Sequence, residues 1–324
     1  MKILVTGNAG FIGSWLVDKL IKEEYEVIGI DDYSGSTTKN VHSFARYYVE
    51  DCRNEDRIDA IFKLERPEIV YHLAANAAEN KAQFSPIDIT SRNYDAFIKV
   101  LTPFIKYGGK RFIFTSSIAV YGALQTPFKE TDEPEPEDLY GITKLAAEQT
   151  LKVMSKVHGF EYVIARPHNV YGPRQNMRDP YRNVVTIWMN QILRGEPVTI
   201  YGDGTMKRCF SYIDDVIEPL YKCGFEDVSG MTFNIGSDSV YTLNELLKEI
   251  GRRETNYLPK REQEVQEAIA DHTLCKSKLG YKETTLQKGI YNTWKWVLKQ
   301  GPQEPIYTDI EIPNSDKLPR NWKK

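Results

Sequence analysis

The first two dozen residues restrict this chain more than any other stretch. Lys2-Ile-Leu-Val-Thr6 is a short apolar run of β-forming residues, which is typical of a buried parallel strand. It leads directly into Gly7-Asn-Ala-Gly10-Phe-Ile-Gly13, and apolar residues then recur at helical spacing as far as Ile21. A strand, a glycine-rich turn and a helix in this order predict a phosphate cradle. Glycine tolerates the dihedral angles of the turn and lets a pyrophosphate approach the helix N-terminus.

A second strand, Glu26 to Ile30, ends at the acidic pair Asp31-Asp32. An acidic residue about 20 residues beyond the glycines is placed to accept hydrogen bonds from an adenosine ribose. The spacing G-x-x-G-x-x-G differs from the commoner G-x-G-x-x-G, and glycines alone would equally fit a structural turn. The surrounding strand, helix and acid favour a dinucleotide site. Asp31 would repel a 2′-phosphate, and the glycine loop contains no Arg or Lys, so we expect NAD rather than NADP.

Composition excludes several classes of function. The chain has 324 residues, with 41% hydrophobic and 27% charged, as in ordinary globular proteins. A net charge of −3 gives no electrostatic case for nucleic acid or an anionic membrane. The four cysteines are scattered and the five histidines lack metal-ligand spacing, so we expect free buried thiols and no metal. With no signal peptide and no apolar run of membrane-spanning length, we expect a cytoplasmic protein.

Strands alternate with helices through the first half of the chain. Further strands are predicted at 46–49, 69–75, 111–115 and 161–166, and helices at 54–65, 88–107 and 139–158. Asn54 is expected to cap its helix, and Pro103 to disturb the end of the next. This alternation predicts right-handed crossovers and a Rossmann-type, doubly wound parallel sheet of the α/β class.

The pattern loosens beyond Pro167. Strands are predicted at 207–213 and 231–235, and helices at 242–251 and 286–300. We therefore expect an NAD-binding domain of residues 1–166 plus about 205–238. A smaller C-terminal substrate-binding lobe would comprise about 167–204 and 239–324. The tail from Gly301 contains four prolines and is expected to wrap the surface or to be partly ordered.

A second group of residues carries chemistry. Tyr140 and Lys144 are four residues apart near the start of a predicted helix, which places them on one face. The spacing is weak evidence among 20 tyrosines and recurs at Tyr291 and Lys295, which we interpret as a surface pair. Only Tyr140 follows the strand that ends at Ser116-Ser117. Lowering a tyrosine pKa by ~3 units needs about 4 kcal/mol, which Lys144 and a cationic nicotinamide would together supply.

The chain resembles the extended short-chain dehydrogenase/reductases, within the NAD-dependent nucleotide-sugar epimerase/dehydratase group that includes UDP-glucose 4-epimerase. The resemblance covers Lys2 to about Tyr281. It rests on the glycine loop, His72-Leu-Ala-Ala75, Asn93, Thr115-Ser-Ser-Ile-Ala-Val-Tyr-Gly122, Tyr140-Gly-x-x-Lys144, Arg166-Pro-His-Asn-Val-Tyr-Gly-Pro173, Gly202-Asp-Gly204 through Arg208, Ala270-Asp271 and Leu279-Gly-Tyr281.

The resemblance implies a role for each matching residue. Ser117 would hydrogen-bond the reacting oxygen, Tyr140 would act as base and then acid, and Lys144 would hold the ribose and tune Tyr140. The cofactor-binding set would be Gly7, Gly10, Phe11, Ile12, Gly13, Asp31, Asp32, Asp51, Cys52, Leu73, Ala74, Ala75, Asn93, Tyr140, Lys144 and Pro167. The substrate, a nucleotide-diphosphate sugar, would be bound by Ser117, His168, Asn169, Arg208, Arg261 and Glu264. Arg forks independently suit phosphate geometry, although both arginines could instead be surface ion pairs.

Several departures from the family pattern bear on the reaction. Ile118 and Ala119 stand where dehydratases carry an Asp-Glu pair, which disfavours 4,6-dehydration. His168 replaces the Phe of many 4-epimerases, either as a packed, hydrogen-bonded residue or as a substrate contact or second acid/base. Cys209 replaces a common Asp, and Asn76 to Phe84, which should border the sugar, lacks familiar landmarks.

The leading prediction is reversible epimerisation at C4 through a transient 4-keto sugar. Alternatives are net oxidation by a 4-dehydrogenase, or another keto-intermediate reaction such as 3,5-epimerisation or decarboxylation. A catalytically dead cofactor-binding protein is disfavoured by the intact Ser117, Tyr140 and Lys144. The helices at 88–107 and 139–158 carry more apolar positions than one sheet face requires, so we expect a homodimer.

Overall fold

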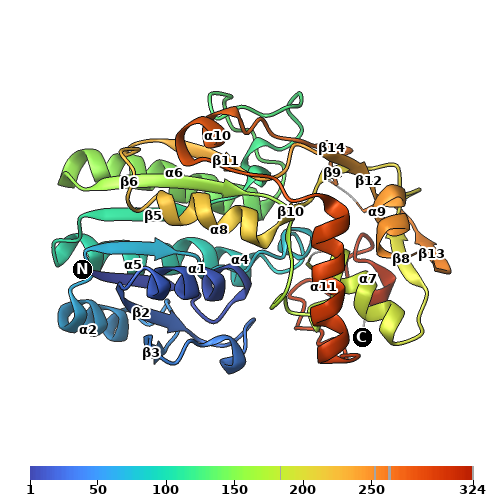
Figure 1. The fold of residues 1–324 in the computed structure, drawn as a ribbon, viewed down its shortest axis with the longest axis horizontal. Coiled ribbons are helices and arrows are strands. Elements are labelled where there is room, and N and C mark those ends of the chain that lie inside the picture. The colour runs from blue at the N-terminus through green and yellow to red at the C-terminus, as the bar shows by residue number, and fades with distance from the viewer. Residues whose placement is uncertain (183, 252, 262–263, 323–324) are drawn as a thin grey trace.

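A seven-stranded parallel sheet forms the centre of the molecule. In this computed structural model, residues 1–182, 184–251, 253–261 and 264–322 are described. The strand order is β11-β6-β5-β4-β1-β2-β3, and each neighbouring pair is parallel (Figure 1). The strands are β1 (Lys2–Thr6), β2 (Glu26–Asp31), β3 (Arg46–Val49), β4 (Ile69–His72), β5 (Arg111–Thr115), β6 (Glu161–Pro167) and β11 (Thr232–Ile235). The predicted Rossmann-type, doubly wound sheet is confirmed.

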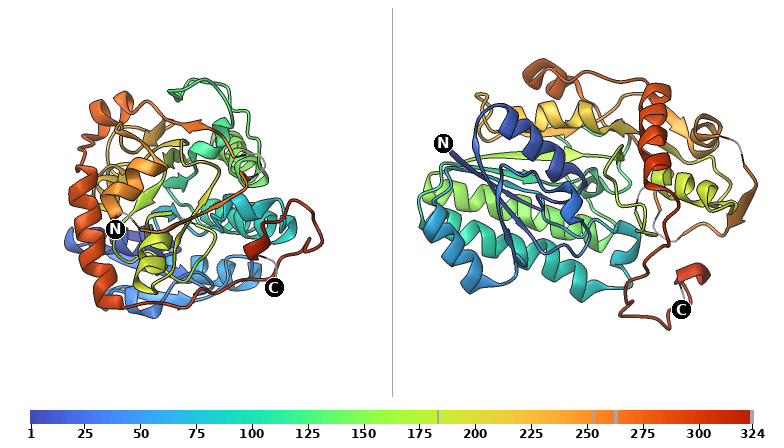
Figure 2. Two further views of the ribbon diagram at one scale, coloured as in Figure 1. Left: turned by 90° about the vertical axis from the view of Figure 1, so that its right-hand side faces the viewer. Right: turned by 60° about the horizontal axis from the view of Figure 1, so that its bottom comes forward.

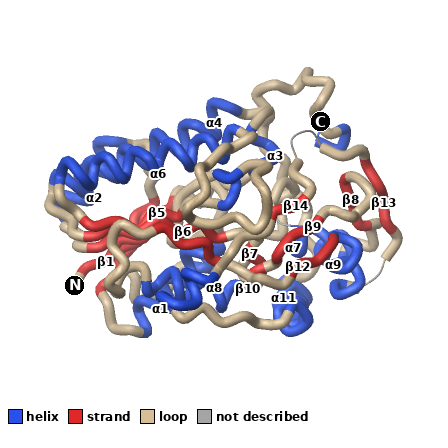
Figure 3. Tube along the Cα trace, turned by 90° about the horizontal axis from the view of Figure 1, so that it is seen from above, coloured by secondary structure: helices blue, strands red, loops and turns tan. Residues whose placement is uncertain are grey.

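Alternating strand residues build two separate hydrophobic cores, one on each face of the sheet. Ile3 and Val5 point to the face covered by α1 (Phe11–Lys22) and α8 (Ile213–Lys222). Leu4, between them, points to the opposite face, which is covered by α2 (Glu55–Glu65), α5 (Ala96–Lys106) and α6 (Leu139–His158). Figure 3 shows the strands lying between these two helical layers. Burial of both faces explains why the strands are continuously apolar.

Three details of the predicted helices differ in the structure. The predicted helix 88–107 begins earlier, as α4 (Pro86–Thr90), and passes through a π-helical turn at Ser91–Asp95 before α5. Pro103 lies inside α5 without ending it. Asn54 occupies the N-cap position of α2 but makes no side-chain cap, because its amide donates to Glu50 instead. Capping was predicted from residue type alone, and a nearby carboxylate competes for the same side chain.

The C-terminal half adds small sheets and further helices beyond the strand ends. The predicted strand 207–213 is wrong as one element: it divides into β9 (Lys207–Cys209) and β10 (Ser211–Tyr212), and α8 already begins at Ile213. The remaining elements are α3 (Glu79–Ala82), β7 (Val170–Tyr171), α7 (Val184–Leu193), β8 (Val198–Tyr201), β12 (Val240–Thr242), α9 (Leu243–Ile250), β13 (Thr255–Leu258), β14 (Glu267–Ala268), α10 (Thr273–Leu279) and α11 (Leu286–Gln300), with 3-10 turns at Thr38–Asn40, Ile118–Tyr121 and Arg320–Trp322.

The tail after α11 wraps across the surface, as predicted, and ends in the turn Arg320–Trp322 (Figure 2). It is fixed by backbone hydrogen bonds from Ile306 to Arg178 and from Ile312 to Phe84, of 2.7 and 3.0 Å. Trp322 is buried in a small hydrophobic cluster, and Phe84 packs against this cluster. Among the described helices, none is long and apolar enough to cross a membrane.

Candidate active site

A large cavity lies at the carboxyl ends of the central strands. Its volume is about 1620 Å³, and it extends from the glycine turn after β1 to the loops of the C-terminal half. Parallel α/β sheets bind ligands at this edge, where loops from neighbouring strands diverge. Because typical small-molecule pockets measure ~300–1,000 Å³, this cavity has room for a dinucleotide and a second nucleotide.

The glycine turn has the geometry that a pyrophosphate site needs. Gly7 has a φ of +71°, and a Cβ there would lie 2.9 Å from the Ala74 nitrogen. A Cβ on Gly13 would lie 2.0 Å from the Gly7 carbonyl oxygen, so α1 can approach the turn only without a side chain at this position. Gly10 precedes α1 and makes no side-chain cap, which leaves the first backbone N–H groups of the helix for an anion. The residues present therefore fit NAD.

The acidic residues predicted to bind adenosine line the cavity and are already partly engaged. Asp31 accepts hydrogen bonds from the backbone of Ala9 and Tyr33, at 3.0 and 2.9 Å, which ties the glycine turn to the end of β2. Asp32 forms an ion pair of 3.0 Å with Arg92, a cavity residue that sequence reasoning missed. The Asp51 carboxylate is held by Arg53 at 2.6 Å, which lowers its pKa.

Nearly all the predicted cofactor residues line the cavity. They are Gly7, Gly10, Phe11, Ile12, Gly13, Asp31, Asp32, Asp51, Cys52, Leu73, Ala74, Ala75, Tyr140, Lys144 and Pro167. Asn93 is the exception. Its side-chain oxygen accepts from the Asn76 nitrogen at 2.8 Å, and its amide donates to the Asn76 carbonyl at 3.1 Å. It therefore fixes the segment after β4 from behind the cavity wall.

The three predicted catalytic residues come together although two elements supply them. Ser117 follows β5 and its side chain is hydrogen-bonded to Tyr140, the second residue of α6. Lys144 lies one turn further along α6 and donates to the Thr115 carbonyl oxygen, at 2.8 Å. Its Nζ lies 5.8 Å from the centre of the Tyr140 ring. A hydroxyl pair and an ammonium group thus share one wall of the cavity.

Burial controls the protonation of these groups. It lowers the pKa of Lys144 to about 7, against the opposing charge of Glu148. Burial also raises the pKa of Tyr140, and the hydrogen bond with Ser117 only partly opposes the rise. The expected lowering of the Tyr140 pKa by Lys144 is therefore not produced by the protein's own groups, because Lys144 is itself desolvated and bonded to a carbonyl.

The predicted substrate residues line the other end of the cavity. Arg208 donates to the carbonyl oxygens of Lys207 and Val265, both at 2.8 Å, which fixes its guanidinium along β9. Arg261 forms a two-point ion pair with Glu264 and lies 4.2 Å over the ring of Tyr201. Asn169 has a left-handed φ of 41°, and its buried Nδ2 has no partner among the described residues. An unpaired buried donor in a cavity wall is a position where a ligand acceptor would bind.

His168 is packed between protein groups. Its Nε2 lies 2.7 Å from Nε2 of His272, whose Nδ1 is 2.6 Å from Asp238. Burial lowers the pKa of His168 to about 3, so the ring stays neutral at pH 7. This geometry favours the packed, hydrogen-bonded role over a second acid/base. Cys209 is also buried, and all four cysteines are free, as predicted. No group of His, Cys, Asp and Glu able to hold a metal occurs among the described residues.

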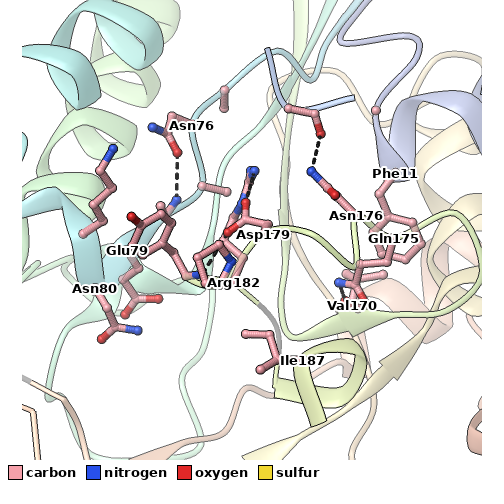
Figure 4. A pocket seen from close by; sticks show the side chains of 18 of the residues that line it. Phe11, Asn76, Glu79, Asn80, Val170, Gln175, Asn176, Asp179, Arg182 and Ile187 are labelled. Carbon is pink, nitrogen blue, oxygen red and sulfur yellow. Dashed lines mark hydrogen bonds and ion pairs between the residues drawn. The ribbon is translucent and has the colours of Figure 1, made fainter. Parts of the chain in front are cut away.

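The sequence did not identify several residues that face the substrate end. Glu79 and Arg182 line it, and Figure 4 shows them with Asp179 in the wall opposite Phe11. Thr308 and other tail residues form a further part of that wall, and the Thr308 hydroxyl accepts from Lys81 at 2.6 Å. A sheet edge can be predicted from strand periodicity, whereas contacts across hundreds of residues carry no local signal.

The chain belongs to the NAD dependent epimerase/dehydratase family, whose pattern matches residues 3–236. It is similar to a structure of UDP-glucose 4-epimerase from Thermotoga maritima with UDP-glucose, with 37% identity, a TM-score of 0.88, and coverage of 93% of this chain and 99% of that one. It is also similar to a structure of UDP-glucuronic acid 4-epimerase from Bacillus cereus in complex with UDP-glucuronic acid and NAD. The identity is 31%, the TM-score is 0.84, and the match covers 93% of this chain and 99% of that one. A putative UDP-glucose 4-epimerase from Methanocaldococcus jannaschii is 34% identical over 304 residues, which span 91% of this chain and 98% of that protein.

Proposed function

We propose that this protein is an NAD-dependent 4-epimerase of a UDP-sugar. The observation that carries the proposal is the convergence of Ser117, Tyr140 and Lys144 between a dinucleotide cradle and an arginine-lined end of the same cavity. We choose UDP as the nucleotide because the similar structures are complexes with UDP-sugars. Their match to nearly the whole chain supports a shared reaction.

Each residue has a role that agrees with its position. Tyr140 takes the proton of the C4 hydroxyl and later returns one, while Ser117 holds the same oxygen by a hydrogen bond. Lys144 holds the nicotinamide ribose, and Arg208, Asn169 and Arg261 bind the diphosphate. NAD held in the glycine cradle would supply the acceptor for the C4 hydride and, once reduced, the donor for its return to the other face of the keto sugar.

The alternatives share the first step and differ in the fate of the keto sugar. A 4-dehydrogenase would release the oxidised sugar, and a 3,5-epimerase or decarboxylase would act on the keto intermediate. Ile118 and Ala119, the two residues after Ser117, cannot transfer protons, which argues against water elimination. The complete set of Ser117, Tyr140 and Lys144 argues against a catalytically dead protein.

Incubation with UDP-, GDP-, CDP- and dTDP-sugars and NMR of the products test the proposal. We expect a C4 isomer of a UDP-sugar and little steady-state absorbance from reduced cofactor. Tyr140→Phe should retain NAD and sugar binding but lose roughly 10²–10⁴-fold in turnover, the usual effect of a positioned general base. Ser117→Ala should lose less. Accumulated reduced cofactor would favour the dehydrogenase, and normal turnover by Tyr140→Phe would refute the mechanism.

We also propose the division into an NAD-binding domain of 1–166 with about 205–238 and a sugar-binding lobe of about 167–204 and 239–324. The position of β11 in the central sheet supports the first unit. A homodimer is supported by exposed apolar residues along α6, where Ile142, Val153 and Val157 are 49%, 60% and 67% exposed. Four buried free cysteines support a reducing, cytoplasmic location.

A further inference from the structure

Two carboxyl groups face the cavity beside the proposed base. Ala82 of α3 packs in one cluster with Tyr140, and Glu79 lies three residues earlier on the same short helix. Asp138 precedes Tyr140 by two residues and caps α6 by accepting from the Gly141 nitrogen at 2.7 Å. Both carboxyl groups line the cavity and are hydrogen-bonded to one another. The segment after β4 is thereby connected to the helix that presents Tyr140.

A hydrogen bond between two carboxyl groups requires one proton. The side chain of Glu79 is exposed to the cavity, and its enclosure there and then the charge of Asp138 raise its pKa. Burial also raises the pKa of Asp138, but the backbone hydrogen bond from Gly141 opposes that rise and favours the ionised form. Glu79 is therefore the protonated member and Asp138 the charged one. The pair has one net negative charge together with several free acceptor positions.

The arginines at this end of the cavity already have partners, which weakens their electrostatic attraction for the Glu79–Asp138 pair. Arg182 is paired with Asp179, and Arg261 with Glu264. Arg208 is held by backbone carbonyl oxygens along β9 and is assigned to the diphosphate. Among the described residues around Tyr140, the negative charge of the Glu79–Asp138 pair is consequently not cancelled by an ion pair of its own.

We propose that the Glu79–Asp138 carboxyl pair selects a nucleotide sugar whose hexose is uncharged. The inference rests on the proposed function, since it assumes that the sugar reacts at Tyr140. The reacting hydroxyl must lie within about 3 Å of the base, which brings the rest of the ring against the pair. Sugar hydroxyl groups can donate to its free oxygens, whereas the carboxylate of a uronic acid would be repelled. At ~6 Å and an effective dielectric near 20, that repulsion corresponds to about 100-fold in affinity.

The test measures dissociation constants of UDP-glucose and UDP-glucuronate by calorimetry on the NAD-loaded protein. Wild type should bind UDP-glucose about 100-fold more tightly. Glu79→Gln keeps the charge on Asp138 and should retain most of the preference. The double variant Glu79→Gln/Asp138→Asn removes the charge but keeps the hydrogen bond and the helix cap, and should reduce the preference to a few-fold. Glu133→Gln, on the same loop but exposed and outside the cavity, is the matched control.

The outcomes separate the inference from the proposed function. Equal or tighter binding of UDP-glucuronate by wild type would overturn the inference, and epimerisation of either sugar would leave the proposed function intact. A preference that persists in the double variant, with normal NAD affinity as the test of folding, would also overturn it. Failure of wild type to bind or convert either UDP-sugar would overturn the proposed function, and the inference with it.

Discussion

Replacement of Lys144 by Met should stabilise the cofactor-free protein while it abolishes turnover. The ammonium is 3% exposed, donates to the Thr115 carbonyl oxygen and lies 5.0 Å from the centre of the Phe114 ring. Methionine preserves the length and the apolar contacts of this side chain, so the substitution removes mainly the charge. The increase in the free energy of unfolding should therefore measure how much the burial of the Lys144 charge destabilises the protein.

The magnitude is set by the pKa, which falls from 10.5 to about 7 on folding. Each unit corresponds to about 1.4 kcal/mol, so burial costs about 4 kcal/mol at pH 7. The lost hydrogen bond offsets about 1 kcal/mol, which leaves a net gain of ~3 kcal/mol for Lys144→Met. Because the folded pKa is lowered, the full cost applies below pH 7 and disappears as the unfolded lysine deprotonates towards pH 10.5. By pH 9 the gain should have shrunk by about 2 kcal/mol.

Chemical denaturation at pH 7 and pH 9, on protein stripped of NAD, measures both quantities. Lys152→Met, at an exposed position of the same helix, is the control and should change stability little. If Lys144→Met is less stable than wild type at pH 7 while the control is unchanged, desolvation is refuted as the dominant effect. If the gain in stability does not depend on pH, packing of the methionine rather than loss of the charge is its cause.

Two further predictions concern the cofactor and the assembly. Because Asp31 lies at the end of β2 and already holds the glycine turn, wild type should prefer NAD to NADP by titration, and Asp31→Ala should lose selectivity as well as affinity; a wild-type preference for NADP would remove this assignment. Sedimentation should show a dimer at micromolar concentration, and Val153→Glu, on the exposed apolar face of α6, should yield monomers that still bind NAD; a monomeric wild type would refute the dimer.

The sequence predicted best what depends on local pattern. The apolar runs at β1, β4 and β5 are buried on both faces, and the glycine turn needs its glycines for reasons visible in their spacing. Since parallel strands end at one edge, residues just beyond them, such as Ala75 and Ser117, could be assigned to one site without knowledge of the fold. Tyr140 could be assigned to the same edge because it lies near the start of the helix that follows the strand before Ser117.

Several side chains whose roles were predicted from residue type and spacing have competing partners in the structure. Asn54 can cap a helix, but Glu50 accepts its amide. Lys144 can lower a neighbouring tyrosine pKa, but a carbonyl oxygen and burial dominate its environment. Asn93 matches a cofactor motif, yet its amide is used by the backbone of Asn76. Residue type and spacing predict what a group can do, whereas the partner it takes depends on contacts made after folding.

The substrate end of the cavity shows most clearly why its specificity was not predicted. Glu79 belongs to a short helix with no strong periodicity, and its position depends on Ala82 packing against Tyr140 and on Lys81 reaching Thr308 in the tail. Glu311 adds a second anchor by accepting from the nitrogens of Ile87 and Asp88, both at 2.8 Å. Contacts between segments more than 200 residues apart in sequence thus hold the tail against α3, which carries Glu79, and against α4. The chemistry of the reaction is therefore predictable from local motifs, but the choice of sugar depends on long-range packing that a single sequence does not reveal.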